Sequence, residues 1–143
     1  MKTIVNEMKV RLRAVSENES VARAVVSAFV ATLNPQVEEL SDLRCAVSEA
    51  VTNAVVHAYP KEHGFLYISV RLYQPREVTV EVSDSGVGIA DVEQAREPFF
   101  TTGIPGERCG MGFLVMESFC DEVTVKSKVG RGTRVLLRKC LKP

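Results

Sequence analysis

Hydrophobic and polar residues alternate in five short stretches of the chain, and this period of two predicts half-buried strands. In the first stretch Met8, Val10 and Leu12 alternate with basic residues. Turn residues separate the later stretches in pairs, Gln74-Pro75-Arg76 in one pair and Gly130-Arg131-Gly132 in the other, which predicts two antiparallel hairpins. The predicted strands cover residues 8–13, 66–72, 78–82, 123–125 and 135–137.

Two long helices are predicted between the first strand and the first hairpin. The run from Ser16 to Glu19 has the pattern of a capping box, and the helix that it opens is expected to end near Leu33. Asn34-Pro35 predicts the start of the second helix, with Asn34 as N-cap and Pro35 as the first helical residue. We expect this helix to run to about Ala58, because a proline follows two residues later.

Two shorter helices are predicted in the second half, near Asp91–Arg96 and over Gly110–Phe119. In the latter, the residues spaced to face the core are Met111, Leu114, Val115 and Phe119. Helices grouped between antiparallel hairpins predict an α+β fold. We expect a two-layer sandwich with helices on one face of a mixed, mainly antiparallel sheet.

Length and composition fit one soluble domain spanning residues 1–143, with 45% hydrophobic and 25% charged residues. The 18 basic and 18 acidic side chains cancel, so we expect no direct nucleic-acid partner. No stretch approaches the roughly 20 apolar residues of a membrane span. Arg11 and Arg13 interrupt the first apolar run, so a secretory signal is not expected and a cytoplasmic location is.

Three polar residues, Glu49, Asn53 and His57, follow one another at intervals of four along the second predicted helix. This spacing places them in one line beside the apolar face of the helix. Glu49 can take a proton from an attacking hydroxyl, and the amide oxygen of Asn53 suits Mg²⁺. Taken alone, the same residues also fit a solvated helix edge with His57 as a C-terminal cap.

The run Asp84-Ser85-Gly86-Val87-Gly88 follows a predicted strand. A carboxylate there can accept a hydrogen bond from a purine amino group, and the glycines allow the backbone to approach a ring or a phosphate closely. By itself the run also fits an ordinary tight turn.

A long polar loop, from about Phe99 to Cys109, has the composition of a closing lid and leads into Gly110-Met111-Gly112 at a helix start. Helix N-termini favour anions, and Arg108 has the forked donors that suit a terminal phosphate. An ordinary surface loop is the alternative. Thr133, at the start of the last strand, either assists Asp84 with adenine or serves only as a β-branched strand residue.

In their order along the chain these features resemble the GHKL (Bergerat-fold) ATP-binding superfamily, from about Glu49 to Thr133. Within it, the chain is similar to the sporulation anti-sigma F factor family of protein serine kinases. The runs that carry the narrower likeness are Ser16-Glu17-Asn18-Glu19-Ser20 with Arg23, Val47-Ser48-Glu49-Ala50-Val51-Thr52-Asn53-Ala54, Pro98-Phe99-Phe100-Thr101-Thr102, and Glu107-Arg108 before Gly110-Met111-Gly112-Phe113.

The resemblance implies an ATP-dependent serine kinase that uses Mg²⁺, with Glu49 as catalytic base and Asn53 as the Mg²⁺ ligand. Asp84 would read the adenine amino group. The other implied ATP-binding residues are Gly86, Gly88, Thr101, Arg108, Gly110, Met111, Gly112 and Thr133. One departure is Gly103, where the family often has lysine; Arg108 and Lys61 are the candidates to compensate.

For partners, the resemblance implies a sporulation sigma factor, which the protein sequesters, and an anti-anti-sigma factor, which it phosphorylates on serine. Both would bind the helix face that carries Glu19 and Arg23, and residues 1–33 would also form a homodimer interface. From spacing alone, Glu19 and Arg23 also fit a surface ion pair. The alternative functions are a nucleotide-gated anti-sigma binding module of a stress-response system and a histidine-kinase-type catalytic domain.

Overall fold

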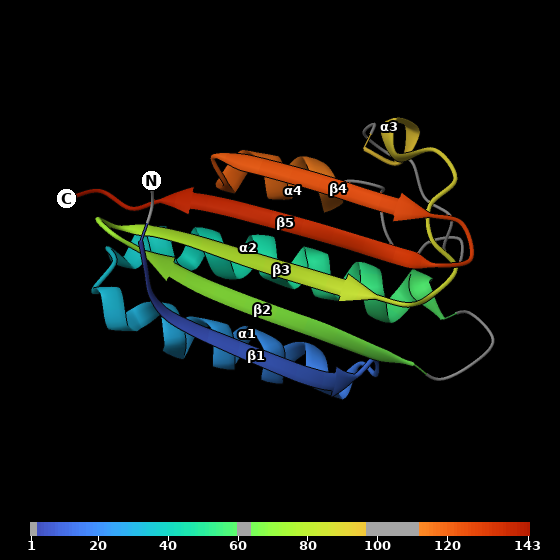
Figure 1. The fold of residues 1–143 in the computed structure, drawn as a ribbon, viewed down its shortest axis with the longest axis horizontal. Coiled ribbons are helices and arrows are strands. Elements are labelled where there is room, and N and C mark those ends of the chain that lie inside the picture. The colour runs from blue at the N-terminus through green and yellow to red at the C-terminus, as the bar shows by residue number, and fades with distance from the viewer. Residues whose placement is uncertain (1–2, 60–63, 97–111) are drawn as a thin grey trace.

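Five strands form one sheet in the computed structural model, which describes residues 3–59, 64–96 and 112–143 (Figure 1). The strands are β1 (Ile4–Arg13), β2 (Phe65–Tyr73), β3 (Glu77–Asp84), β4 (Glu122–Lys128) and β5 (Gly132–Cys140). They lie in the order β1-β2-β3-β5-β4, and each of the four pairings is antiparallel. The described sheet is therefore antiparallel throughout, where the sequence predicted a mainly antiparallel one.

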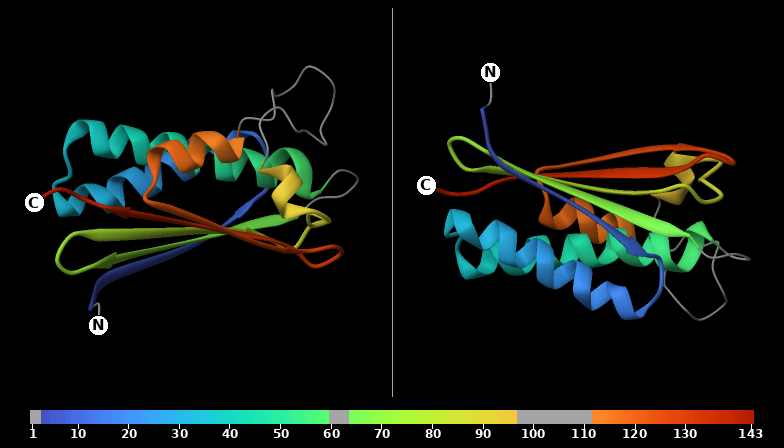
Figure 2. Two further views of the ribbon diagram at one scale, coloured as in Figure 1. Left: turned by 90° about the horizontal axis from the view of Figure 1, so that it is seen from above. Right: turned by 60° about the horizontal axis from the view of Figure 1, so that its bottom comes forward.

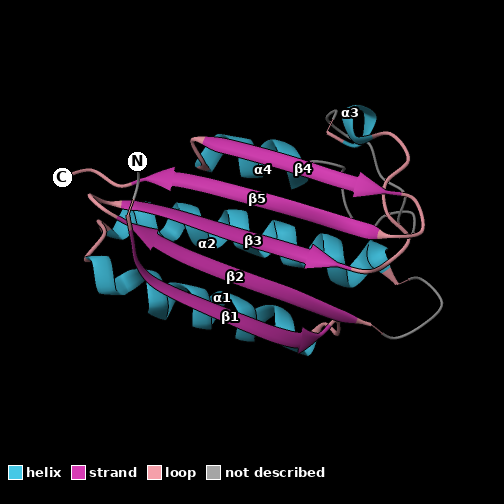
Figure 3. Cartoon of the chain, viewed as in Figure 1, coloured by secondary structure: helices cyan, strands magenta, loops and turns pink. Residues whose placement is uncertain are grey.

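Helices cover one face of this sheet, as predicted, and leave the other face open (Figures 2 and 3). The helices are α1 (Glu17–Val30), α2 (Val37–Asn53), α3 (Val92–Ala95) and α4 (Gly112–Phe119). A 3₁₀ turn, Ala31–Leu33, follows α1, and a π-helical turn, Ala54–Ala58, continues α2. The predicted order of elements is confirmed in full.

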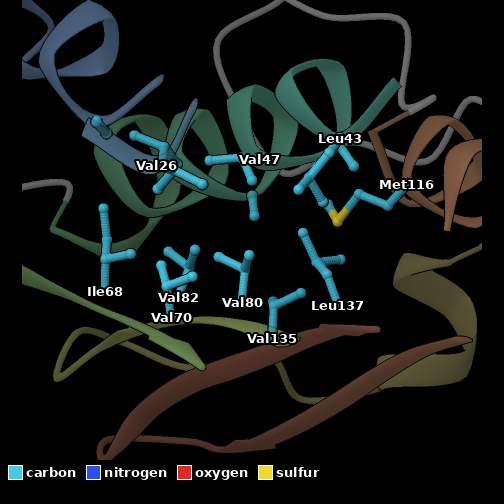
Figure 4. Packing of buried hydrophobic residues seen from close by; sticks show 14 of the residues in the cluster. Val26, Leu43, Val47, Ile68, Val70, Val80, Val82, Met116, Val135 and Leu137 are labelled. Carbon is cyan, nitrogen blue, oxygen red and sulfur yellow. The ribbon is translucent and has the colours of Figure 1, made fainter. Parts of the chain in front are cut away.

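The core lies between the two layers, where alternate strand residues meet the apolar stripes of the helices (Figure 4). On β2, for example, Leu66, Ile68 and Val70 are buried and the residues between them face away. This burial follows the alternation in the sequence. The largest fully buried side chains are Leu43, Leu66, Ile68, Leu72, Met116, Leu137, Val26, Val30, Val47, Val51, Val70 and Val78.

The start of α1 differs from the predicted capping box. Ser16 has helical backbone angles, and its hydroxyl donates to the adjacent Glu17 carboxylate at 3.0 Å. The Glu19 carboxylate instead accepts a hydrogen bond from Thr52 of α2 at 2.5 Å. Glu19 therefore makes a tertiary contact with α2 instead of the backbone contact that a capping box requires.

The start of α2 also differs, by two residues. Asn34 adopts the left-handed conformation, with φ of 52°, and ends the 3₁₀ turn instead of capping α2. Asparagine tolerates this conformation better than most residues. Gln36 is the N-cap, and its backbone N–H donates to the Glu39 carboxylate at 2.9 Å.

The core face of α4 was predicted only in part, since Phe119 packs against the core as expected but the two buried residues are others. Phe113 and Met116 are its buried residues, whereas Leu114 is 36% exposed. Met111 lies outside the described residues. Four apolar residues follow one another from position 113 to 116, so hydrophobicity alone does not select a face of so short a helix.

Arg76, in the β2–β3 turn, forms hydrogen bonds with two other segments at one end of the molecule. Its guanidinium donates to the carbonyl oxygens of Leu33 at 2.6 Å, Asn34 at 3.1 Å and Lys142 at 2.8 Å. The turn thus holds both the connection between α1 and α2 and the C-terminal segment.

Replacing Arg76 with alanine is expected to lower the free energy of unfolding by about 1.5–3 kcal/mol, the usual range for hydrogen bonds to a charged group. Chemical denaturation measures this loss. Arg131→Ala, at an exposed arginine in the β4–β5 turn, is the control and should change stability by about 0.5 kcal/mol or less. Equal stability of the two variants would contradict the role given to Arg76.

No helix in the described ranges is long and apolar enough to cross a bilayer.

Candidate nucleotide site

A cleft of about 470 Å³ opens between α2, the end of β3 and the β4–β5 hairpin. This volume is typical of small-molecule sites. Predicted site residues that line it are Asn53, Asp84, Gly88, Gly112 and Thr133, with His57 also in its wall. The other lining residues are mostly apolar: Ala50, Ala54, Ala58, Val82, Val87, Ile89, Ala90, Asp91, Gln94, Ala95, Phe113, Val129 and Val135.

The π-helical turn lies in this wall, since Ala54, His57 and Ala58 all line the cleft. Such turns are rare and are frequent at functional sites. His57 therefore belongs to the cleft and is not simply an exposed helix cap.

Glu49 and Asn53 come together at the first residue of α4. A Cβ atom placed on Gly112 would lie 3.3 Å from Oε2 of Glu49 and 3.5 Å from Oδ1 of Asn53. A side chain at this position would therefore press closely on Glu49 and contact Asn53. Asn53 lines the cleft, whereas Glu49 lines a neighbouring groove. The two residues therefore lie where the cleft and the groove meet.

The loop after β3 is held by close backbone contacts. A Cβ atom on Gly86 would lie 2.1 Å from the carbonyl oxygen of Ala58, and that same oxygen accepts a hydrogen bond from the N–H of Val87 at 2.8 Å. Gly88 has φ of +77°, in the left-handed region that favours glycine. Gly86 thus allows the loop to approach closely the π-helical turn that follows α2.

Asp84 is half-buried at the start of this loop. Its carboxylate accepts the N–H of Gly86 at 2.9 Å, and the N–H of Thr133 is a second donor. Burial raises the pKa of Asp84 above its ordinary value of 3.8, although both N–H donors act in the opposite direction. The folded protein therefore holds a carboxylate whose charge is only partly compensated.

Asp84→Asn is expected to raise the melting temperature of the nucleotide-free protein at pH 7, because it removes this buried charge while keeping an acceptor for the two N–H groups. A raised carboxyl pKa costs stability only where the folded group is ionised, so the gain should shrink as pH falls towards 3.8. Thermal melts from pH 7 to pH 4 measure it. The variant should also bind ATP more weakly, and a gain that is independent of pH would contradict the charge argument.

Two residues that sequence reasoning missed position the cleft. The hydroxyl of Tyr59 accepts the N–H of Ser85 at 2.8 Å and donates to the carbonyl of Phe65 at 2.7 Å. The hydroxyl of Ser127 accepts the N–H of Ile89 at 2.7 Å and lies 2.8 Å from the Thr133 hydroxyl. The contacts with Ser85 and Ile89 join segments 26 and 38 positions apart in the chain, so no local sequence pattern predicts them.

Glu19 and Arg23 reach across to α2. Arg23 donates to the Ser48 hydroxyl at 3.2 Å, and Glu19 accepts from Thr52. Within the described part of the chain, no ion pair joins Glu19 to Arg23, so the surface pair that their spacing suggested is not formed. Both side chains are half-buried at the junction of α1 and α2.

Several predicted residues lie outside the described ranges. They are Lys61, Thr101, Gly103, Arg108, Gly110 and Met111, together with the loop predicted as a lid.

The oxygen donors at the junction of cleft and groove are few. In residues 3–59, 64–96 and 112–143, no group of three His, Cys, Asp or Glu side chains could hold a metal ion. Mg²⁺ commonly binds through one or two protein oxygens together with water and substrate phosphates. Asn53 therefore fits an ion that arrives with a nucleotide rather than a resident metal.

Known proteins are similar to this chain in sequence and in fold. Residues 12–139 match the family model of the histidine kinase-like ATPase domain. An anti-sigma F factor of a Geobacillus species is 50% identical over 135 residues, which cover 94% of this chain and 92% of the relative. The anti-sigma F factor of Clostridium acetobutylicum is 46% identical over 134 residues, covering 94% and 93%.

Solved structures agree on the fold. The RsbU and RsbW domains of a Mycobacterium tuberculosis protein superpose with a TM-score of 0.71 at 20% identity, covering 97% of this chain and 34% of that chain. The histidine kinase domain of a blue-light activated kinase from Erythrobacter litoralis gives 0.58 at 18% identity, covering 86% and 65%.

Proposed function

The chain belongs to the anti-sigma F factor family and has a histidine kinase-like ATPase domain, and on this premise we propose that it binds ATP in the cleft and phosphorylates a protein serine. Its partners would be a sporulation sigma factor, which it sequesters in the cytoplasm, and an anti-anti-sigma factor, which it phosphorylates. Residues 1–33 would contribute to a homodimer interface and to partner binding.

The observation that carries this proposal is the meeting of Glu49 and Asn53 beside Gly112, at the edge of a largely apolar cleft. Asp84 would accept the adenine amino group inside the cleft, with Thr133 beside it. The loop carrying Gly86 and Gly88 shapes this end of the pocket. The remaining ATP contacts are assigned to Thr101, Arg108, Gly110, Met111 and Gly112.

Phosphoryl transfer requires mainly positioning and charge neutralisation from a protein. Asn53 would hold Mg²⁺ through its amide oxygen, and the ion would offset negative charge on the phosphates. Glu49 accepts the proton of the serine hydroxyl as that oxygen bonds to the terminal phosphorus. The bond from this phosphorus to the bridging oxygen breaks and ADP leaves, while Arg108 contacts the transferred group.

Incubation of the protein with ATP, Mg²⁺ and its anti-anti-sigma factor tests the proposal. The expected product is acid-stable phosphoserine on the partner. Acid-labile phosphohistidine would instead favour the histidine-kinase type. Partner binding without any ATP consumption would leave only a nucleotide-gated binding module.

A further inference from the structure

A second hollow lies on the helical layer, directly beside Glu49. It is a groove of about 350 Å³. Its lining residues are Arg23, Ser41, Arg44, Cys45, Ser48, Glu49, Val115 and Phe119, from α1, α2 and α4. Glu49 lines this groove, and its carboxylate also lies close to Gly112, which lines the nucleotide cleft, so the groove and the cleft are neighbours at Glu49.

In-line phosphoryl transfer places the attacking and leaving oxygens on opposite sides of the phosphorus. If the leaving ADP occupies the cleft, the accepting hydroxyl has to approach the terminal phosphorus from the side away from ADP, within hydrogen-bond reach of Glu49. The groove is lined by Glu49 and is distinct from the cleft, which makes it the candidate path for that hydroxyl. Its position follows from the arrangement of α2, which contributes Asn53 to one hollow and Ser48 to the other.

The composition of the groove fits an acidic, partly apolar peptide segment. Ser41, Cys45 and Ser48 lie on one strip of α2, and Val115 and Phe119 of α4 supply apolar surface. The charged residues Arg23 and Arg44 add two guanidinium groups, and among the described lining residues Glu49 is the one acid. Arginine pairs well with carboxylates, which makes a basic groove complementary to an acidic segment.

Resting on the proposed kinase activity, we propose that this groove binds the substrate segment that carries the accepting serine, and that Arg44 is a specificity-determining residue that recognises an acidic side chain near that serine. Arg23 is already engaged with the Ser48 hydroxyl at 3.2 Å. Arg44 is exposed at the groove and is therefore the better candidate for direct recognition.

The test is the steady-state kinetics of phosphorylation of the anti-anti-sigma factor by Arg44→Glu. We expect KM for this substrate to rise about 10-fold or more, since like charges then face each other, with kcat changed by less than about two-fold. The Kd for ATP should stay the same. Ser41→Trp, which fills the groove without changing charge, should also raise KM for the protein substrate and leave ATP binding intact.

Lys126→Glu is the matched control, because it makes the same charge reversal at an exposed position on the edge strand β4. It should leave KM for the protein substrate and the Kd for ATP unchanged. Normal transfer by the wild type with an unaltered KM for Arg44→Glu would overturn the groove assignment alone. Absence of transfer by the wild type would overturn the proposed function and this inference with it.

Discussion

Glu49→Gln is expected to lower the rate of phosphoryl transfer to the partner's serine by about 10²–10⁴-fold, the usual contribution of a general base. Glutamine keeps the size of the side chain beside Gly112 but does not accept the proton of the serine hydroxyl. ATP affinity should be nearly unchanged, because Glu49 is not among the residues that line the cleft. Single-turnover kinetics with saturating partner measure the rate, and equilibrium binding of ATP measures the affinity.

The control for Glu49→Gln is Glu38→Gln, which makes the same change at an exposed glutamate in the first turn of α2. This variant should transfer phosphate at the wild-type rate. If Glu49→Gln also transferred at that rate, the catalytic assignment would be wrong. If it lost ATP binding to the same extent as activity, Glu49 would be a nucleotide ligand rather than a base.

Gly86→Ala is expected to disturb the nucleotide site through the backbone. The new Cβ atom would lie 2.1 Å from the carbonyl oxygen of Ala58, a distance that forces the loop away from the π-helical turn that follows α2. Overpacking of this kind costs about 1–3 kcal/mol of stability. The displaced loop would also misplace Asp84, whose lost hydrogen bonds correspond to a fall in ATP affinity of about 10-fold or more.

Gly130→Ala serves as the comparison for Gly86→Ala. Gly130 has φ of +80°, but no atom of the residues that the structure describes, apart from its chain neighbours, lies within 4 Å of the point that a Cβ atom would occupy there. Alanine at this position therefore brings backbone strain of about 1–2 kcal/mol without a clash. Thermal melts and ATP titrations should show both variants destabilised and only Gly86→Ala impaired in binding. Equal ATP affinity of the two variants would show that the contact with Ala58 does not position the site.

The sequence predicts the sheet and the line of polar residues on α2 because both depend on simple periods. Alternation at positions 66–72 and 78–82 allows only one face to be buried, and it predicted the correct hairpin. The predicted helix caps at Ser16 and at Asn34 were wrong, because in the structure neither side chain caps the helix that it was expected to start. Glu19 accepts a hydrogen bond from Thr52, which lies 33 positions away, so no local motif could predict this contact.

The candidate site was predictable in its residue types and only partly in its shape. Asp84 and Asn53 fall in one cleft, as their chemistry suggested. The division of Glu49 and Asn53 between two hollows was not predictable, because it depends on where α4 begins relative to α2. Tyr59 and Ser127 were missed for the same reason, since their contacts depend on tertiary structure.

One turn of α2 has consequences for regulation. Ser48 and Thr52 hold Arg23 and Glu19 of α1, while Glu49 and Asn53, the next residue in each case, face the groove and the cleft. A shift of this turn would therefore change the contacts with α1 and the positions of Glu49 and Asn53 together. If bound ATP raises the affinity of α1 for a partner by some factor, that partner must raise the affinity for ATP by the same factor, because such coupling is reciprocal. At equilibrium, a partner that favours the ATP-bound form would thus raise the fraction of the protein that holds ATP.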